Sequence, residues 1–241
     1  MAWFFTDDVI SGENYIITGE TAKHISKSLR MKCAEQLTLC SADGIQHNCI
    51  IESIQQDAVT VKILESCRCE QEPDVKITLF QALPKGDKME YIIQKAVELG
   101  VTQIVPFISS RCISRPDKKS LEKKTQRWQK IAKSAAEQSR RGIIPKVCDT
   151  LDFTSAVQEG EKSDCLVIFY EGGGERVSKI LDGTEKSVAV FIGSEGGFDE
   201  KEVEKILSSG GKAATLGKRI LRAETAPLAA VAILMYETGN M

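Results

Sequence analysis

The sequence predicts an α/β protein in two parts, with a small β-rich part followed by a parallel sheet covered by helices. Residues 1–72 hold short strand-like runs separated by turn signals, whereas residues 73–241 alternate strand-like and helix-like runs. Such alternation is typical of a parallel sheet with helices on both faces. The polar, proline-containing stretch Glu70–Asp74 separates the two patterns. We therefore expect two domains, 1–72 and 73–241.

The first part is expected to be a small barrel. Its strand-like runs are Trp3–Thr6, Asn14–Ile17, Gln36–Cys40, His47–Glu52 and Ala58–Leu64. Turn signals such as Ala42-Asp-Gly44 lie between them, and Thr21–Met31 is helical in composition. Several short strands in so few residues favour a barrel over an open sheet.

The second part has strand-like runs at Val75–Phe80, Val101–Val105, Cys165–Tyr170, Val188–Ile192 and Ala213–Leu216. After the first run, the apolar residues follow helical spacing (Met89, Ile92, Ile93, Ala96 and Val97), and Gly100 is expected to end that helix. A last helix, Pro227–Tyr236, is apolar nearly all round and must be buried on more than one side. Either a second subunit or the monomer's own core could cover it.

Two glycine-punctuated turns, Gly193–Phe198 and Leu216–Ala226, each follow a strand-like run and precede a helix. Asp199 and Glu202 have the spacing of a capping box, and Phe198 and Val203 that of a hydrophobic staple. The first turn is therefore expected to present main-chain amides near a helix N-terminus, which suits a carboxylate or a hydroxyl-rich ligand. It is not a phosphate P-loop, because no Gly-Lys-Ser/Thr follows it. A purely structural turn is the alternative reading.

Composition excludes several classes of protein. The chain is 42% apolar and 27% charged, as in ordinary globular proteins, and no apolar run is long enough to span a bilayer. The first residues lack the basic region of a signal peptide, so we expect a cytoplasmic protein without a membrane partner. Eight cysteines lack any C-x-x-C pair and there are only two histidines, so we expect reduced thiols and no metal site.

Basic residues gather in one segment of a chain whose net charge is −2. Residues 111–146 contain twelve Lys or Arg but only three Asp or Glu. A cluster of this kind is typical either of a phosphate-binding surface or of a solvated helix face. Composition alone leaves both readings open.

Several motifs of the second part, in one order, resemble the RsmE family, ribosomal RNA uridine N3-methyltransferases of the SPOUT superfamily. The motifs are Gln81–Glu90, Ile93–Gly100, Arg127-Trp128, Ala135–Arg140, Tyr170-Glu171, Gly193–Phe198 and Leu216–Ala226. The first part is also similar, through His24, Leu29–Lys32 and Asp43-Gly44. The chain departs from the family at Ser194, where the family usually has Pro, at Cys33–Glu35, which replaces a Gly-Asp turn, and at Ala2-Trp3, where relatives often carry Arg.

The resemblance implies a PUA-like barrel over 1–72 that helps to bind RNA, and a SPOUT domain over 73–241 with a trefoil knot at its C-terminal end. It also implies a homodimer, S-adenosyl-L-methionine as cofactor, and methylation of uracil N3 in 16S ribosomal RNA of the assembled small (30S) subunit. Two alternatives are a non-catalytic RNA-binding assembly factor and a SPOUT enzyme that methylates the ribose 2′-hydroxyl.

Three sets of candidate residues follow. Arg222 is expected to stabilise negative charge that develops on the uracil, and Glu224 to orient Arg222 or to accept the N3 proton. The cofactor set is Tyr170, Glu171, Gly193, Glu195, Gly196, Gly197, Leu216, Gly217, Ile220 and Leu221. The RNA set is Arg30, Lys124, Arg127, Lys130, Arg140 and Arg141.

Overall fold

The computed structural model describes residues 2–241, which form two compact units. The first unit consists of two segments, the N-terminal one up to Glu72, and Glu137–Ile144. The second unit consists of Pro73–Ala136 and Pro145–Met241. The predicted domains 1–72 and 73–241 differ from these units in the segment Glu137–Ile144, which folds with the first unit.

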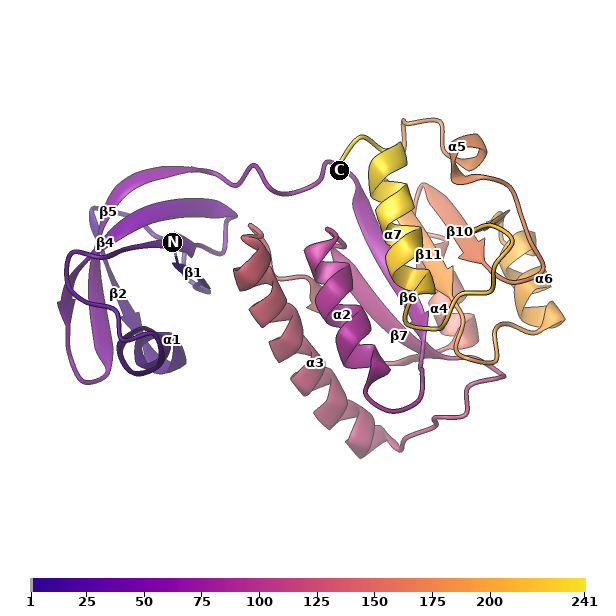
Figure 1. Cartoon of the computed structure of the whole chain (residues 1–241), viewed down its shortest axis with the longest axis horizontal. Helices are drawn as coiled ribbons and strands as arrows, with labels where there is room; N and C mark the ends of the chain where they lie inside the picture. Colours follow the sequence, from indigo (N-terminus) through magenta and orange to yellow (C-terminus); the bar gives the residue numbers. More distant parts are fainter. Residues whose placement is uncertain (1) are drawn as a thin grey trace. The chain divides into compact units, whose positions relative to one another are not determined.

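The strands of the first unit, indigo to purple in Figure 1, form a mixed sheet. The sheet has five strands, in the order β1-β3-β4-β5-β2. The strands are β1 (Ala2–Phe5), β2 (Asn14–Thr18), β3 (Gln36–Cys40), β4 (Ile45–Ile54) and β5 (Ala58–Arg68). Irregular register at two points of β4 bends the sheet, as β-bulges do. The expected helical stretch folds as α1 (Gly19–Lys23), followed by a π-helical turn, η1 (His24–Ser28). Apolar side chains including Ile25, Leu37 and Val61 form the core of this unit.

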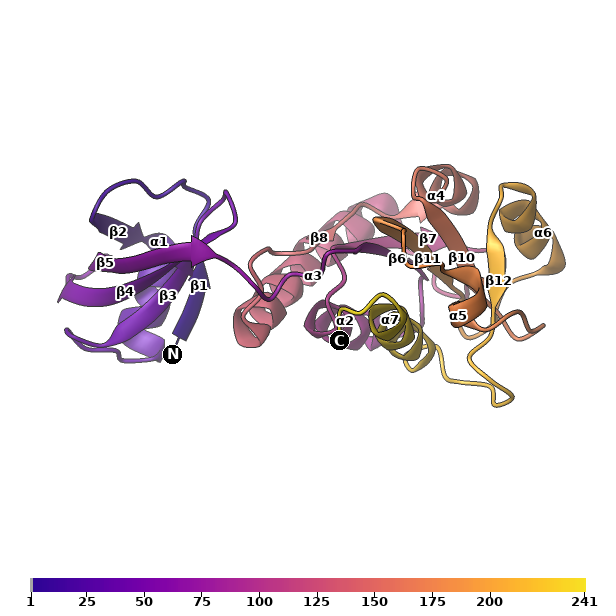
Figure 2. The same ribbon diagram turned by 90° about the horizontal axis from the view of Figure 1, so that it is seen from above.

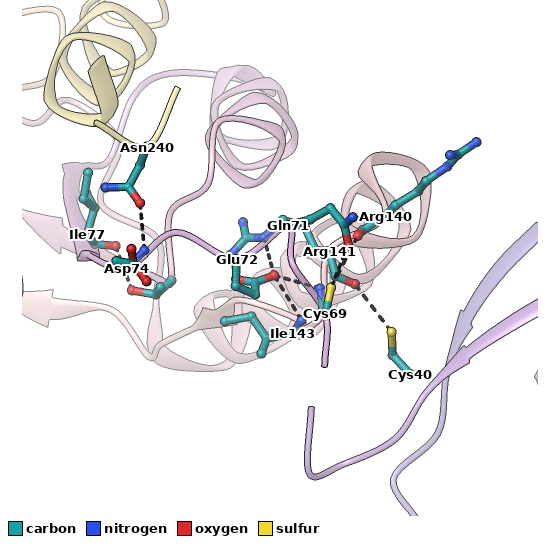
Figure 3. Close-up of polar contacts among 12 residues, drawn as sticks. Cys40, Cys69, Gln71, Glu72, Asp74, Ile77, Arg140, Arg141, Ile143 and Asn240 are labelled. Carbon is teal, nitrogen blue, oxygen red and sulfur yellow. Dashed lines mark hydrogen bonds and ion pairs between the residues drawn. The ribbon is translucent and has the colours of Figure 1, made fainter. Parts of the chain in front are cut away.

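The segment Glu137–Ile144 is attached to this unit by polar contacts that converge on Glu72 (Figure 3). The Arg141 guanidinium donates two hydrogen bonds to the Glu72 carboxylate, from Nε at 2.8 Å and from a terminal nitrogen at 2.7 Å. The Gly142 amide donates to the same carboxylate at 2.7 Å. The Arg141 carbonyl accepts from the Trp3 indole at 3.0 Å and from the Cys40 thiol at 3.8 Å. We name these five residues the Glu72 clamp.

The second unit is built on an all-parallel sheet of order β12-β10-β11-β6-β7-β8, with β9 also paired to β7. Its strands are β6 (Lys76–Ala82), β7 (Gln103–Ile108), β8 (Lys146–Val147), β9 (Leu151–Asp152), β10 (Cys165–Phe169), β11 (Ser187–Ile192) and β12 (Lys212–Ala214). Its helices are α2 (Lys88–Glu98), α3 (Lys118–Ser139), α4 (Phe153–Gly160), α5 (Val177–Ile180), α6 (Glu200–Ser208) and α7 (Ala226–Glu237).

Helices cover both faces of the parallel sheet, which confirms the predicted architecture of this part. Helices α2 and α7 lie on one face, and α4 and α6 lie on the other (Figure 2). The apolar stripe predicted for α2, from Met89 to Val97, is buried, and Gly100 follows the helix with a positive φ of 100°. A side chain at Gly100 would collide with Met235 of α7, so glycine also permits this close packing.

Candidate active site

A cavity of about 410 Å³ lies at the carboxyl ends of three adjacent strands, β10, β11 and β12. Because the strands are parallel, the segments that follow them meet at this edge. The volume is within the range of about 300–1,000 Å³ typical of small-ligand sites. The predicted cofactor residues that line it are Tyr170, Glu171, Gly193, Glu195, Gly197, Leu216, Gly217, Ile220 and Leu221. The structure thus brings together three sequence segments that are far apart in the chain.

The turn between β11 and α6 forms one wall of the cavity. Gly197 has a φ of 66°, and its amide donates to the Ser194 carbonyl at 2.9 Å. A side chain at Gly197 would come within 2.6 Å of a Glu171 carboxylate oxygen, so the turn requires glycine there. The predicted capping box is confirmed, since Asp199 accepts from the Glu202 amide at 2.8 Å and Glu202 accepts from the Asp199 amide at 3.1 Å.

The segment between β12 and α7 forms the opposite wall. Leu216 and Leu221 are half-buried at the cavity, whereas Ile220 is 89% exposed. The carbonyl of Arg222 accepts from the amides of Thr225 and Ala226, both at 2.9 Å, which leads the chain into α7. The side chain of Arg222 is exposed and lines the cavity, and within residues 2–241 no hydrogen bond or ion pair engages its guanidinium.

Glu224 pairs with a residue that the sequence did not single out. Its carboxylate lies 3.2 Å from Nζ of Lys88, the first residue of α2, and the same Nζ lies 2.9 Å from the Glu195 carboxylate. Lys88 also lines the cavity. We name Lys88, Glu195 and Glu224 the carboxylate–lysine triad. Lys88 lies within the Gln81–Glu90 motif and follows β6, whereas Glu195 follows β11. Because β6 and β11 are neighbours in the sheet, the strand order predicts that Lys88 lies close to Glu195.

The triad changes the protonation properties of its members. The hydrogen bond that the Lys88 ammonium donates to Glu195, and then its contact with Glu224, raise the pKa of Lys88. Burial on its own would raise the pKa of Glu195, but the Lys88 ammonium and the amides of Glu195 and Lys85 lower it overall. The pKa of Glu224 is lowered by its own amide, by Lys88 and by Arg222. Both carboxylates are consequently ionised at neutral pH, with one lysine held between them.

A second missed residue, Arg111, joins two walls of the cavity. Its guanidinium donates to the Gly196 carbonyl at 3.1 Å and lies 3.7 Å from the Glu171 carboxylate. Gly196 therefore lies beside the cavity and contacts Arg111 rather than lining the wall. Arg111 is the first residue of the basic segment 111–146, and its contacts with a main-chain carbonyl and a carboxylate fit neither a phosphate-binding surface nor a solvated helix face.

The predicted RNA set divides by exposure. Arg30, Arg127, Lys130 and Arg140 are exposed, and Lys124 is half-exposed. Arg127 pairs with Glu90 at 2.8 Å while remaining 66% exposed. Arg141 differs, because only 3% of its side chain is exposed and Glu72 binds its guanidinium. Its buried position is explained by the Glu72 clamp, and a phosphate has no access to it.

Residues 2–241 contain no cluster of three or more metal-ligating side chains, and all eight cysteines are free. Over the same residues, the helices are too short or too polar to cross a membrane.

Comparison with known proteins gives one consistent result. The model of the RNA methyltransferase domain family matches residues 70–235. Ribosomal RNA small subunit methyltransferase E of Bacillus subtilis (strain 168) is 38% identical, over 93% of this chain and 90% of the relative. The protein of that name from Mesomycoplasma hyopneumoniae (strain 232) is 33% identical, over 89% of this chain and 90% of the relative.

Solved structures agree. The crystal structure of ribosomal RNA small subunit methyltransferase E from Neisseria gonorrhoeae, bound to S-adenosyl methionine, is 32% identical, covers 98% of this chain and 97% of its own, and has a TM-score of 0.90. A methyltransferase from Legionella pneumophila, in complex with the same cofactor, is 31% identical with a TM-score of 0.88 and the same coverage. Fold, cavity and sequence therefore agree that this chain belongs to the ribosomal RNA small subunit methyltransferase E family.

Proposed function

We propose that this protein methylates small-subunit (16S) ribosomal RNA with S-adenosyl-L-methionine, at uracil N3 of one uridine in the assembled 30S subunit. The observation that carries the proposal is the cavity, whose walls are the motifs that resemble the RsmE family. The substrate class follows from the relatives, which are named for small-subunit ribosomal RNA. Such a substrate also implies work in the cytoplasm, where ribosomal subunits are found.

The residues present fit this cofactor. Glu171 and Glu195 supply negative charge at the cavity for the cationic groups of the cofactor. Leu216 and Leu221, both half-buried, offer apolar surface for the adenine, with main-chain groups beside them for its polar edge. Tyr170, half-exposed at the end of β10, would close the methionine side. When bound, the cofactor supplies a methyl group that its sulfonium has already activated.

The protein's own residues must hold the uracil and handle its N3 proton. The Arg222 guanidinium has no hydrogen bond or ion pair to the rest of residues 2–241, and it offers a planar set of donors to O2 or O4, where negative charge grows as the proton leaves. Glu224 is ionised at neutral pH, so it is able to accept that proton. Its ion-pair partner in the structure is Lys88 rather than Arg222, which argues against direct orientation of Arg222, and its lowered pKa makes it a weaker base than a carboxylate whose pKa burial has raised.

RNA would be held by exposed cations. Arg30 and Arg140 both have left-handed backbones, with φ of 53° and 58°, a conformation that glycine adopts at lower cost. Strained, exposed residues of this kind are often retained for function. We expect binding to weaken steeply with added salt, and Arg140→Gly to reduce RNA affinity without loss of stability. If RNA affinity does not change with salt concentration, these cations form only a solvated surface and do not bind phosphates.

The finer architecture belongs to the same proposal. The mixed sheet of residues 1–72 supports a PUA-like, RNA-binding barrel, and residues 73–241 would be the methyltransferase domain. After β12, at the edge of the sheet, the chain runs back to α7, which packs on β6 and β11. Glu175 pairs with Ala214 and Thr215 beside this path. This return of the chain supports a trefoil knot.

The helix α7 supports a homodimer, because it is apolar on its partly exposed side as well as on its buried side.

The test uses 30S subunits from cells that lack the protein, the purified protein and labelled S-adenosyl-L-methionine. Mass spectrometry of the digested RNA should show new N3-methyluridine. Arg222→Ala should lower kcat by about 10²–10³ while the variant stays folded. A ribose-methylated nucleoside would instead identify a 2′-O-methyltransferase. RNA binding without any methyl transfer or cofactor binding would identify a non-catalytic assembly factor.

A further inference from the structure

Lys88 joins its own segment of the cavity to two others. It begins α2 at the carboxyl end of β6, while Glu195 belongs to the turn after β11 and Glu224 to the segment after β12. The two carboxylates come from the opposite walls described above, and each lies within 3.2 Å of the same ammonium. No covalent link or strand pairing joins Glu195 to Glu224 in the described residues, and Lys88 is a direct polar link between them.

The two carboxylates depend on Lys88 to different degrees. Glu195 is also held by the Lys85 amide, which lies 3.2 and 3.4 Å from its two oxygens. Glu224 has Lys88 as its ion-pair partner, and the oxygen that faces Lys88 is buried. Without the ammonium, that buried oxygen would have no counter-charge and would face a second carboxylate across the gap. The segment after β12 would then move away from the turn after β11.

The partial burial of the triad makes this effect larger than for a surface ion pair. The side chains of Lys88, Glu195 and Glu224 are 32%, 28% and 23% exposed. Solvent screens charges less strongly at this depth than on an open surface. Lys88 and both carboxylate-bearing segments line the cavity, so any movement of these segments changes the cavity itself.

We propose that Lys88 is a positioning residue that holds the two walls of the cofactor cavity together through Glu195 and Glu224, so that tight cofactor binding requires its positive charge. The inference rests on the proposed function, because it takes S-adenosyl-L-methionine as the ligand. It assigns to Lys88 no contact with the reacting atoms. Preorganised walls reduce the ordering cost of binding, and their loss therefore appears in cofactor affinity.

The test measures binding of S-adenosyl-L-homocysteine, the product form of the cofactor, by calorimetry. Lys88→Gln should weaken binding about tenfold. Lys88→Arg, which keeps the charge, should restore most of the affinity. Lys85→Gln is the matched control, since it removes the same charge from the same turn, and the Lys85 side chain makes no contact with the triad. It should bind as the wild type does.

A double-mutant cycle separates positioning from a general loss of stability. Glu224→Gln should also weaken binding, and Lys88→Gln combined with Glu224→Gln should lose little more than either change alone, because both break the same contact. In turnover assays, Lys88→Gln should raise KM for the cofactor.

The outcomes are distinct. Equal binding by wild type and Lys88→Gln would overturn the inference while leaving the proposed function intact. Additive losses in the cycle would overturn it too. Failure of the wild type to bind S-adenosyl-L-homocysteine would instead overturn the proposed function. If Lys88→Gln does not fold, the affinities of Lys88→Arg and Glu224→Gln for S-adenosyl-L-homocysteine test the inference instead. Full affinity in Glu224→Gln would contradict the positioning role.

Discussion

At the scale of single residues, the backbone is most constrained where a residue other than glycine has a positive φ. Within residues 2–241 this occurs at Arg30, Ala34 and Arg140. Ala34 has a φ of 68° and is held there because its amide donates to the Ile51 carbonyl at 2.8 Å. Ala34 lies in the turn Cys33–Glu35, where the RsmE family usually has Gly-Asp. Glycine adopts a positive φ of this kind at lower cost than alanine does.

Ala34→Gly should therefore stabilise the protein. Alanine in the left-handed region costs about 1–2 kcal/mol, and glycine's greater freedom in the unfolded chain offsets part of the gain. The net increase in the free energy of unfolding is expected to be about 0.5–1 kcal/mol. Urea titration of both proteins would measure it. Ala42→Gly, at an exposed alanine without a positive φ, is the control and should be neutral or destabilising.

Cysteine reactivity also varies from residue to residue. Burial raises the pKa of the Cys40 thiol to about 12, with further contributions from Cys69 and Glu72. Only the thiolate attacks alkylating reagents, so Cys40 should stay unmodified at pH 8 as long as the protein is folded. The exposed Cys33 and Cys67 should react first. Peptide mass spectrometry after timed alkylation would show the order. Labelling of Cys40 as fast as Cys33 would contradict its burial.

At the scale of the elements, the Glu72 clamp explains how a segment far along the chain completes the first unit (Figure 3). The Arg141 side chain is 3% exposed, so its charge is compensated by Glu72 and not by water. The bidentate contact and the Gly142 amide fix the segment after α3 against the end of the barrel-like sheet. The sheet of residues 1–72 is thus stabilised by residues outside it.

Glu72→Ala should destabilise the protein by about 3 kcal/mol, because it removes the carboxylate that accepts two hydrogen bonds from the buried Arg141 guanidinium. Chemical denaturation followed by tryptophan fluorescence would detect the loss, since the indole of Trp3, one of the two tryptophans, bonds to the Arg141 carbonyl. Glu70→Ala is the matched control, because Glu70 is exposed on the same connecting stretch. Equal stability of the two variants would show that the clamp contributes nothing.

At the scale of the whole molecule, local sequence patterns predict the helices and strands, whereas the pairing of strands distant in sequence determines which residues meet at the site. The stripe from Met89 to Val97, the apolar α7 and the Asp199–Glu202 capping box depend on neighbours in sequence, and all three were predicted. The triad depends on β6 lying beside β11, which no local pattern encodes. Arg141 looked like its neighbour Arg140, because its partner Glu72 lies 69 residues away.

The last helix, α7, has an apolar side that its own unit leaves partly exposed. One side of α7 is buried by its own unit, through Pro227, Ala230, Val231, Leu234 and Met235. The other side carries Leu228, Ala229, Ala232 and Ile233, which are half-exposed, and Tyr236, which is 71% exposed. A continuous apolar strip of this kind is costly in water, and covering it favours association. The proposed homodimer would bury it.

Ala232→Glu should therefore convert the dimer into a monomer, because it places a charge at the centre of this strip. Sedimentation velocity over a concentration series would show the change in mass. Leu207→Glu is the control, since Leu207 is a 42% exposed apolar residue on α6, which covers the opposite face of the sheet (Figure 2). It should leave the dimer unchanged. The segment that leads into α7 also lines the cavity, so the monomeric variant should bind S-adenosyl-L-homocysteine more weakly. A monomeric wild type would refute the dimer and require α7 to tolerate its exposed apolar side.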